Sequence, residues 1–196
     1  MNRLCTLAAA FLIPAAGWAQ TSDALFDDSV VHEIRLRMHP NDWSTLRERF
    51  FDNTYYPAEF TWQGRVFPLA GVRSRGLGSR SQQKPGLKVD FNRYADLTFL
   101  GLKAVVLDNN VQDSSWLRER LSMLLFRRMG LPAPRETYTR LFVNNVFVGL
   151  YSTIEEIDKA FLRRATGDDS GFLYEYKWSR QYRLEELPED LPILTL

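Results

Sequence analysis

Apolar and polar residues alternate over several short stretches of the chain, a pattern typical of half-buried strands. The alternation is clear in residues 30–38 and continues in the aromatic-rich stretches 55–62 and 66–69, which Gln63-Gly64 joins as a hairpin turn. The same reasoning predicts strands at residues 71–75, 85–91, 102–107, 137–143, 146–154 and 172–176. A second hairpin is expected at Asn144-Asn145, because asparagine tolerates the positive φ of a tight turn.

Helical spacing of apolar residues is strongest in residues 116–130, where Leu117, Leu121, Leu124 and Leu125 share one face. One of Asp113, Ser114 and Ser115 would cap this helix, and Gly130 would end it. Shorter helices are predicted at residues 42–50, capped by Asn41 or Asp42, and at 155–164. The apolar face predicts packing against the strands. The expected fold class is therefore α+β, an antiparallel sheet with one long packed helix.

The first residues form a separate segment. A basic residue, an apolar run and small residues predict a signal peptide over residues 1–19, with cleavage after Ala19. The run is too short for a stable membrane span. Export to the periplasm, cell surface or extracellular space is expected, with a flexible mature N-terminus at 20–29 and an irregular tail at 179–196.

Composition excludes several classes of function. The 196 residues are 45% hydrophobic with a net charge of +1, so the chain can bury a core and carries no global field that would favour nucleic acid. Cys5 is the sole cysteine and lies in the signal peptide, which leaves the mature chain without disulfides or thiolate metal sites. The two histidines lack metal-binding spacing, and no hydrolase, Walker or zinc motif occurs.

The residues that favour a specific function lie between Gly71 and Phe91. This stretch contains five cations and no acid before Asp90; the cations are Arg73, Arg75, Arg80, Lys84 and Lys88. Together with the turn Gly76-Leu77-Gly78 they predict an anion site, most plausibly for phosphate. A solvated basic edge that protects a sheet from pairing remains the alternative.

Lys84 and Lys88 are four residues apart, so on one strand they would point to the same face, with Leu87 and Val89 on the other. Glu119 on the long helix would supply a carboxylate that orients such a lysine. The alternative for Glu119 is a solvated pair with an arginine of its own helix.

Several short blocks of the chain resemble the spore coat protein H (CotH) kinase family over residues 30–177. The blocks are Val72-Arg73-Ser74-Arg75-Gly76, Leu87-Lys88-Val89-Asp90-Phe91, Leu107-Asp108-Asn109-Asn110, Ser115-Trp116-Leu117-Arg118, Pro132-Ala133-Pro134, Val143-Asn144-Asn145, Val148-Gly149-Leu150-Tyr151 and Phe172-Leu173-Tyr174. Asn145 stands where the family commonly has Gly, and Pro85-Gly86 where it often has Lys and Ser.

The resemblance implies a protein-kinase-like small lobe over residues 30–178, with the larger lobe missing, and so an incomplete chain that is inactive alone. The whole protein would use ATP and Mg²⁺ to phosphorylate Ser or Thr on surface or exported proteins. The implied ATP phosphate-binding residues are Lys84, Arg75, Gly76, Gly78 and Lys88, with Glu119 orienting the lysine and the hinge at Glu155 and Glu156 facing adenine. Catalytic and metal-binding residues are not expected in this chain.

A second hypothesis keeps the scaffold without catalysis. The chain would then be a secreted binding or adhesion module whose basic loop engages an acidic protein or glycan.

Overall fold

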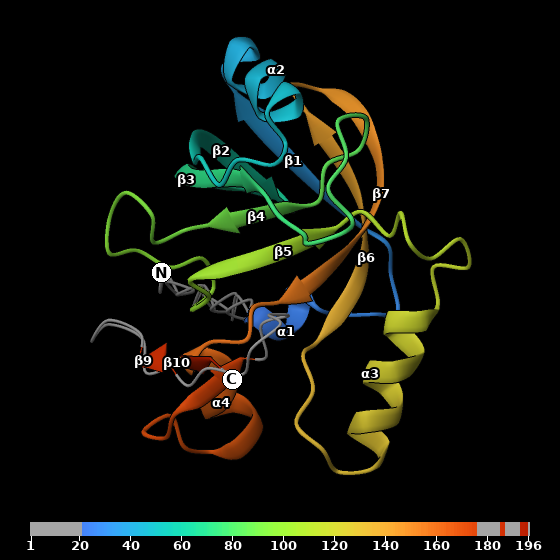
Figure 1. Ribbon diagram of the computed structural model, residues 1–196, viewed down its shortest axis with the longest axis vertical. Helices are drawn as coiled ribbons and strands as arrows, with labels where there is room; N and C mark the ends of the chain where they lie inside the picture. The colour runs from blue at the N-terminus through green and yellow to red at the C-terminus, as the bar shows by residue number, and fades with distance from the viewer. Residues whose placement is uncertain (1–20, 176–184, 187–192, 196) are drawn as a thin grey trace, which may run out of the picture.

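The strands form a closed barrel of mixed direction in the computed structural model, which describes residues 21–175, 185–186 and 193–195 (Figure 1). Around the barrel the order is β1-β2-β3-β4-β5-β7-β6. Their bounds are β1 His32–Met38, β2 Tyr56–Trp62, β3 Arg65–Ser74, β4 Leu87–Asp90, β5 Ala104–Asp108, β6 Glu136–Val143 and β7 Val146–Glu155. The predicted signal peptide lies outside the described residues.

Pairing between β1 and β6 closes the barrel. This pair is parallel, with Ile34 opposite Leu141, whereas the other neighbours in the barrel are antiparallel. Asn144 fixes the register at the end of β1. Its backbone N–H donates to the Leu36 carbonyl at 2.9 Å, and its side-chain oxygen accepts from the Met38 N–H at 2.9 Å. The predicted turn at Asn144-Asn145 is confirmed, with φ values of 50° and 66°.

Side chains of the strands fill the barrel interior. Phe60 packs edge-to-face against Phe91 and Phe99, with both ring centroids at 5.0 Å, and Trp62 and Phe67 extend the cluster. The Trp62 indole N–H donates to Nδ1 of the buried His32 at 3.2 Å, which satisfies its one polar group. Aromatic pairs of this kind are each worth about 1 kcal/mol beyond the area they bury.

Two short helices cover the ends of the barrel (Figure 1). The helix α2, Pro40–Glu48, follows β1 and buries Leu46. His39 caps it by accepting from the Asn41 N–H at 3.2 Å, so the predicted cap at Asn41 or Asp42 is wrong. At the other end α1, Ser22–Leu25, buries Leu25 within the segment expected to be a flexible terminus.

The expected α+β fold with one long packed helix is wrong, and the protein-kinase-like small lobe with it. The helix α3 exists at Arg118–Arg128, but none of its residues is buried, and it stands beside the barrel (Figure 1). Leu121 and Leu125 on its apolar face are 57% and 55% exposed. The described chain is mostly β. The barrel fills its interior with side chains of its own strands, so its core does not depend on packing against α3.

The last described elements follow β7. Asp158 caps α4, Lys159–Thr166, by accepting from the N–H groups of Ala160 and Phe161. A small sheet in the order β8-β10-β9 comprises β8 Leu173–Glu175, β9 Glu185–Glu186 and β10 Ile193–Thr195. Two of its strands fall in the tail where no element is predicted, and the rest of that tail lies outside the described residues. None of the described helices has the length and apolar character needed to cross a membrane.

Candidate functional site

The outer face of the barrel carries a row of side chains that runs across the three strands β4, β5 and β7. Register places Lys88 opposite Val106, and Val106 opposite Ile154. Residues directly opposite in a sheet point to the same face. Val106 and Ile154 are only 3% and 8% exposed although neither belongs to the barrel core. Their side chains are therefore covered by parts of the chain that lie outside the barrel. This row is the floor of a cavity.

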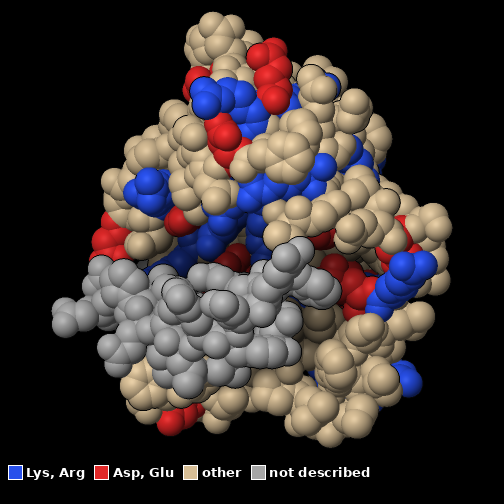
Figure 2. Space-filling view, viewed as in Figure 1, with Lys and Arg blue, Asp and Glu red and all other residues tan. Residues whose placement is uncertain are grey.

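The cavity lies between this outer face, α3 and β8, and has a volume of about 360 Å³. That volume falls within the range of small-ligand pockets. Apolar lining comes mainly from Val106, Met123, Pro134, Ile154 and Ile157, and charged lining from Arg75, Glu119, Glu155 and Glu156. Figure 2 shows Lys and Arg side chains gathered over β4 and β5, with Asp and Glu side chains below them.

Glu155, expected at an adenine-facing hinge, is held from two sides by arginines. Its carboxylate accepts from Arg135 at 2.6 Å and from Arg164 at 2.6 Å, and its backbone N–H donates to the Arg135 carbonyl at 2.9 Å. Burial raises the pKa of Glu155, but hydrogen bonds from Arg164 and Arg135 outweigh it and leave the pKa below its ordinary value. The carboxylate and the backbone N–H of Glu155 both have protein partners. Glu155 therefore fixes the end of β7 at the edge of the cavity.

Glu156, the second expected hinge residue, pairs with Lys88 at 3.0 Å, and both side chains are about one-fifth exposed, at 21% and 19%. The other oxygen of Glu156, Oε2, is buried and has no hydrogen-bond partner among the described residues. A buried acceptor without a donor is costly. Glu156 lines the cavity, while this oxygen itself is closed to solvent.

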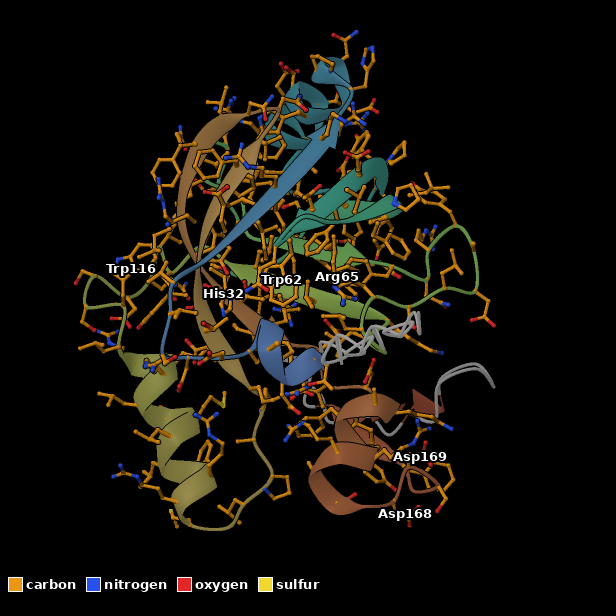
Figure 3. All side chains as sticks on the ribbon, turned by 180° about the vertical axis from the view of Figure 1, so that it is seen from behind. His32, Trp62, Arg65, Trp116, Asp168 and Asp169 are labelled. Atoms are coloured by element: carbon orange, nitrogen blue, oxygen red, sulfur yellow. The ribbon has the colours of Figure 1, made fainter. Side chains whose placement is uncertain are left out.

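Lys84 does not lie on a strand with Lys88, because β4 begins only at Leu87. Its ammonium group donates to the Asn109 carbonyl at 2.8 Å and lies 4.0 Å from the Trp116 ring centroid and 4.9 Å from that of Tyr151. Trp116 belongs to the loop that leads into α3 (Figure 3). Burial lowers the pKa of Lys84 to about 8, partly opposed by Asp108. Lys84 thus contacts a core tyrosine and a loop, and it is not among the residues that line the cavity.

Arg75 and Glu119 are two further predicted site residues that line the cavity, together with Glu155 and Glu156. Glu119 makes no ion pair with Lys84, or with any other cation in the described part of the chain. Burial raises its pKa to about 7, with further increases from Glu136 and Asp108, while Arg75 opposes the rise. The carboxyl group therefore titrates near neutral pH.

The glycine turn between β3 and β4 is held by Arg80. Arg80 donates to the Gly76 carbonyl at 2.7 Å and to the Phe51 carbonyl, also at 2.7 Å. Gly76 has φ +127°, which only glycine adopts readily, and a side chain there would meet Ser79. A Cβ atom at Gly78 would approach the Gln112 side chain to 2.9 Å. The turn is therefore fixed by the protein itself.

Sequence reasoning missed the residues that immobilise this site. Trp116 and Tyr151 enclose Lys84, and Arg135 with Arg164 holds Glu155. The described residues contain no group of three or more His, Cys, Asp or Glu arranged to hold a metal ion. A lone tryptophan between two loops carries no periodic signal, so its contact with Lys84 was not visible beforehand.

Fold and site together define a β-barrel domain with a small-ligand cavity on its outer face, apolar on its floor and edged by Arg75. The family model described as CotH kinase protein matches residues 72–191, well over half of the chain. The chain therefore belongs to the CotH kinase protein family. It is 24% identical over 140 residues to the inner spore coat protein H of Bacillus subtilis (strain 168), covering 71% of this chain and 38% of that protein.

Proposed function

We propose that this domain binds ATP in the cavity on the outer barrel face, as part of a kinase that phosphorylates Ser or Thr on surface or exported proteins. The observation that carries the proposal is the cavity of about 360 Å³. All of its lining residues fall within the segment that the family model matches. The chain spans 38% of the length of its curated relative, so the transfer reaction is proposed for the whole protein.

The residues present fit a nucleotide. A flat purine would lie on the apolar floor of Val106 and Ile154, beside Glu156. Phosphate groups would then extend toward Arg75 and the turn at Gly76, where a guanidinium and backbone N–H groups favour anions. The described residues contain no cluster of three or more His, Cys, Asp or Glu that could hold Mg²⁺.

The alternative, a non-catalytic adhesion module with a basic loop, needs cations that are free to meet an acidic partner. Arg73, Arg80, Lys84 and Lys88 each donate to a protein group instead. This engagement leaves little basic surface on the loop and favours a small ligand in the cavity. Export through residues 1–19 and a place at the cell surface are also proposed, with support from the relative's name, a spore coat protein.

Thermal unfolding of the purified protein with and without nucleotide tests the proposal. A ligand at 100 times its dissociation constant adds about 2.7 kcal/mol to the free energy of unfolding, so ATP is expected to raise the melting temperature by several degrees. Adenosine is expected to give a smaller rise, and sodium tripolyphosphate a smaller rise again. Equal melting temperatures with saturating ATP and with buffer of the same ionic strength would overturn the assignment.

A further inference from the structure

Most of the cations between Gly71 and Phe91 are used by the protein to build the loop. Arg73 donates to Asn53 at 3.2 Å and to the Ser74 carbonyl at 2.8 Å. Arg80 donates to backbone carbonyl groups of the Phe50, Phe51 and Asp52 segment and to the Asn53 side chain. Lys84 and Lys88 have the partners described above. Each of these side chains is already held by at least one protein acceptor.

Arg75 is different. Its backbone N–H pairs with the Gly86 carbonyl at 2.8 Å, but its guanidinium makes no hydrogen bond and no ion pair with any described residue. The side chain is half-buried and lines the cavity. A guanidinium carries five N–H donors in a fixed fork that matches the oxygens of a phosphate group. Because Arg75 lines the cavity and its guanidinium has no described protein acceptor, these donors are available to a ligand.

Glu119 lines the same cavity as Arg75 and is close enough for the charge of Arg75 to lower its pKa. The groups around Glu119 come from several elements: Asp108 at the end of β5, Glu136 on β6, and Arg75 beyond β3. Arg120 and Arg127 on α3 act on Glu136, and Asp113 and Arg118 line a neighbouring hollow that also includes Glu119. Ionised Glu119 offsets part of the positive potential of Arg75, whereas protonated Glu119 does not.

We propose that Arg75 is the residue that binds the ligand's phosphate, that Arg80 and Lys84 only hold the loop, and that Glu119 competes with the phosphate for Arg75. The proposal rests on the proposed function for the identity of the ligand as a nucleotide. It singles out Arg75 among the residues that the family resemblance implied for phosphate binding, and it removes Lys84 from that set. It also makes anion binding dependent on pH through a positioning residue.

The direction of the pH effect follows from the charge of Glu119. Its pKa near 7 means that the carboxylate is mostly ionised at pH 8.5 and mostly protonated at pH 5.5. Ionised Glu119 repels an incoming phosphate and attracts Arg75, so binding is weaker at the higher pH. Glu119→Gln removes the charge at every pH and is expected to bind phosphate as tightly at pH 8.5 as the protonated wild-type protein does.

Calorimetric titration with ATP, tripolyphosphate and adenosine tests the assignment of Arg75. Because a hydrogen bond to a charged group is worth about 1.5–3 kcal/mol, Arg75→Gln is expected to weaken ATP and tripolyphosphate binding by about 10- to 100-fold and to leave adenosine binding unchanged. Lys84→Met is expected to change ATP binding by less than about threefold. Arg37→Gln, which removes an exposed cation on β1, is the matched charge control. Circular dichroism melts show whether each variant is folded.

The outcomes separate this inference from the proposed function. Loss of binding in folded Lys84→Met with binding retained in Arg75→Gln would overturn the inference and leave the nucleotide proposal standing. Arg75-dependent binding of tripolyphosphate with no gain from adenosine would support the inference and overturn the nucleotide proposal. A wild-type protein that binds none of the three probes would overturn both.

The pH arm compares the dissociation constants of wild type and Glu119→Gln from pH 5.5 to 8.5. The ionisation of the phosphate itself cancels in their ratio. The ratio of wild type to variant is expected to rise severalfold with pH, around pH 7. A ratio that stays constant across this range would refute the competition between Glu119 and the phosphate.

Discussion

The ammonium group of Lys84 lies 4.0 Å from the centroid of the Trp116 ring and donates a hydrogen bond of 2.8 Å to the Asn109 carbonyl. These contacts join the loop before β4 to the loop before α3. A cation above an indole face is worth about 0.5–2 kcal/mol, depending on how far it is desolvated. Lys84 therefore ties the loop before β4 to the loop before α3.

The pH dependence of stability follows from the pKa of Lys84, about 8 in the folded protein against an ordinary 10.5. Between these values the unfolded chain binds a proton that the folded protein does not, so stability rises with pH across this window. Urea titrations of wild type and Lys84→Met at several pH values isolate the effect. The difference in free energy of unfolding, wild type minus variant, is expected to increase from pH 8 to 10.5. A flat or falling difference would contradict the burial of this lysine.

Gly149 lies against the same lysine. It has φ +151°, and a Cβ atom there would lie 3.0 Å from Cε of Lys84. Gly149→Ala is expected to destabilise the protein by about 2 kcal/mol through backbone strain and this contact. Gly101→Ala, at φ +79° with no atom within 4 Å of the new Cβ, provides the control for backbone strain alone. In a double-mutant cycle with Lys84→Ala, strictly additive effects would argue against the contact.

Glu155 connects the end of β7 to Arg135 and Arg164 through a carboxylate that is 2% exposed. Glu155→Ala removes the carboxylate that Arg135 and Arg164 share, leaving Arg135 with its ion pair to Asp23 alone, and is expected to cost about 3 kcal/mol. Its lowered pKa means that this stabilisation is present above the ordinary value of 4.5 and is lost as pH falls below it. Chemical denaturation of the variant measures the loss. Glu59→Ala, which breaks the exposed pair with Arg37, is the control and should change stability far less.

Substitutions on the exposed face of α3 distinguish this structure from one in which the helix packs on the strands. Leu121→Gln with Leu125→Gln is expected to change the free energy of unfolding by less than about 1 kcal/mol, because both side chains are more than half exposed. Leu36→Ala in the barrel core, where Leu36 is 1% exposed, is expected to cost about 3 kcal/mol. Equal losses for the two positions would show that α3 packs on the barrel after all.

Much of the strand pattern was predictable, because half-buried strands carry a local signal with a period of two. The turns at Gln63-Gly64 and Asn144-Asn145 were visible for the same reason, since their residues favour positive φ. Closure of the barrel was not. The pairing of β1 with β6 joins segments far apart in sequence. The alternation of apolar and polar residues within a strand does not indicate which strand it pairs with.

Local pattern placed Arg75 at the end of a strand and Glu119 on a helix, and both residues line the cavity. Their roles in ligand binding stay predictions. The surroundings of Lys84 could not be predicted. The strand β4 begins only at Leu87, so Lys84 lies in the preceding loop, with its ammonium group near the Tyr151 ring. For α3, amphipathic spacing predicted the helix but could not say whether its apolar face has a partner.

Photo-crosslinking with 8-azido-ATP tests the central claim most directly, because it locates the nucleotide in the folded protein. After irradiation and proteolysis, label is expected in the peptides that contain Met123 and residues 154–157, and excess ATP is expected to abolish it. Arg75→Gln should reduce the labelling of the same peptides. Labelling confined to other peptides, or labelling that excess ATP does not reduce, would contradict a nucleotide site on the outer face of the barrel.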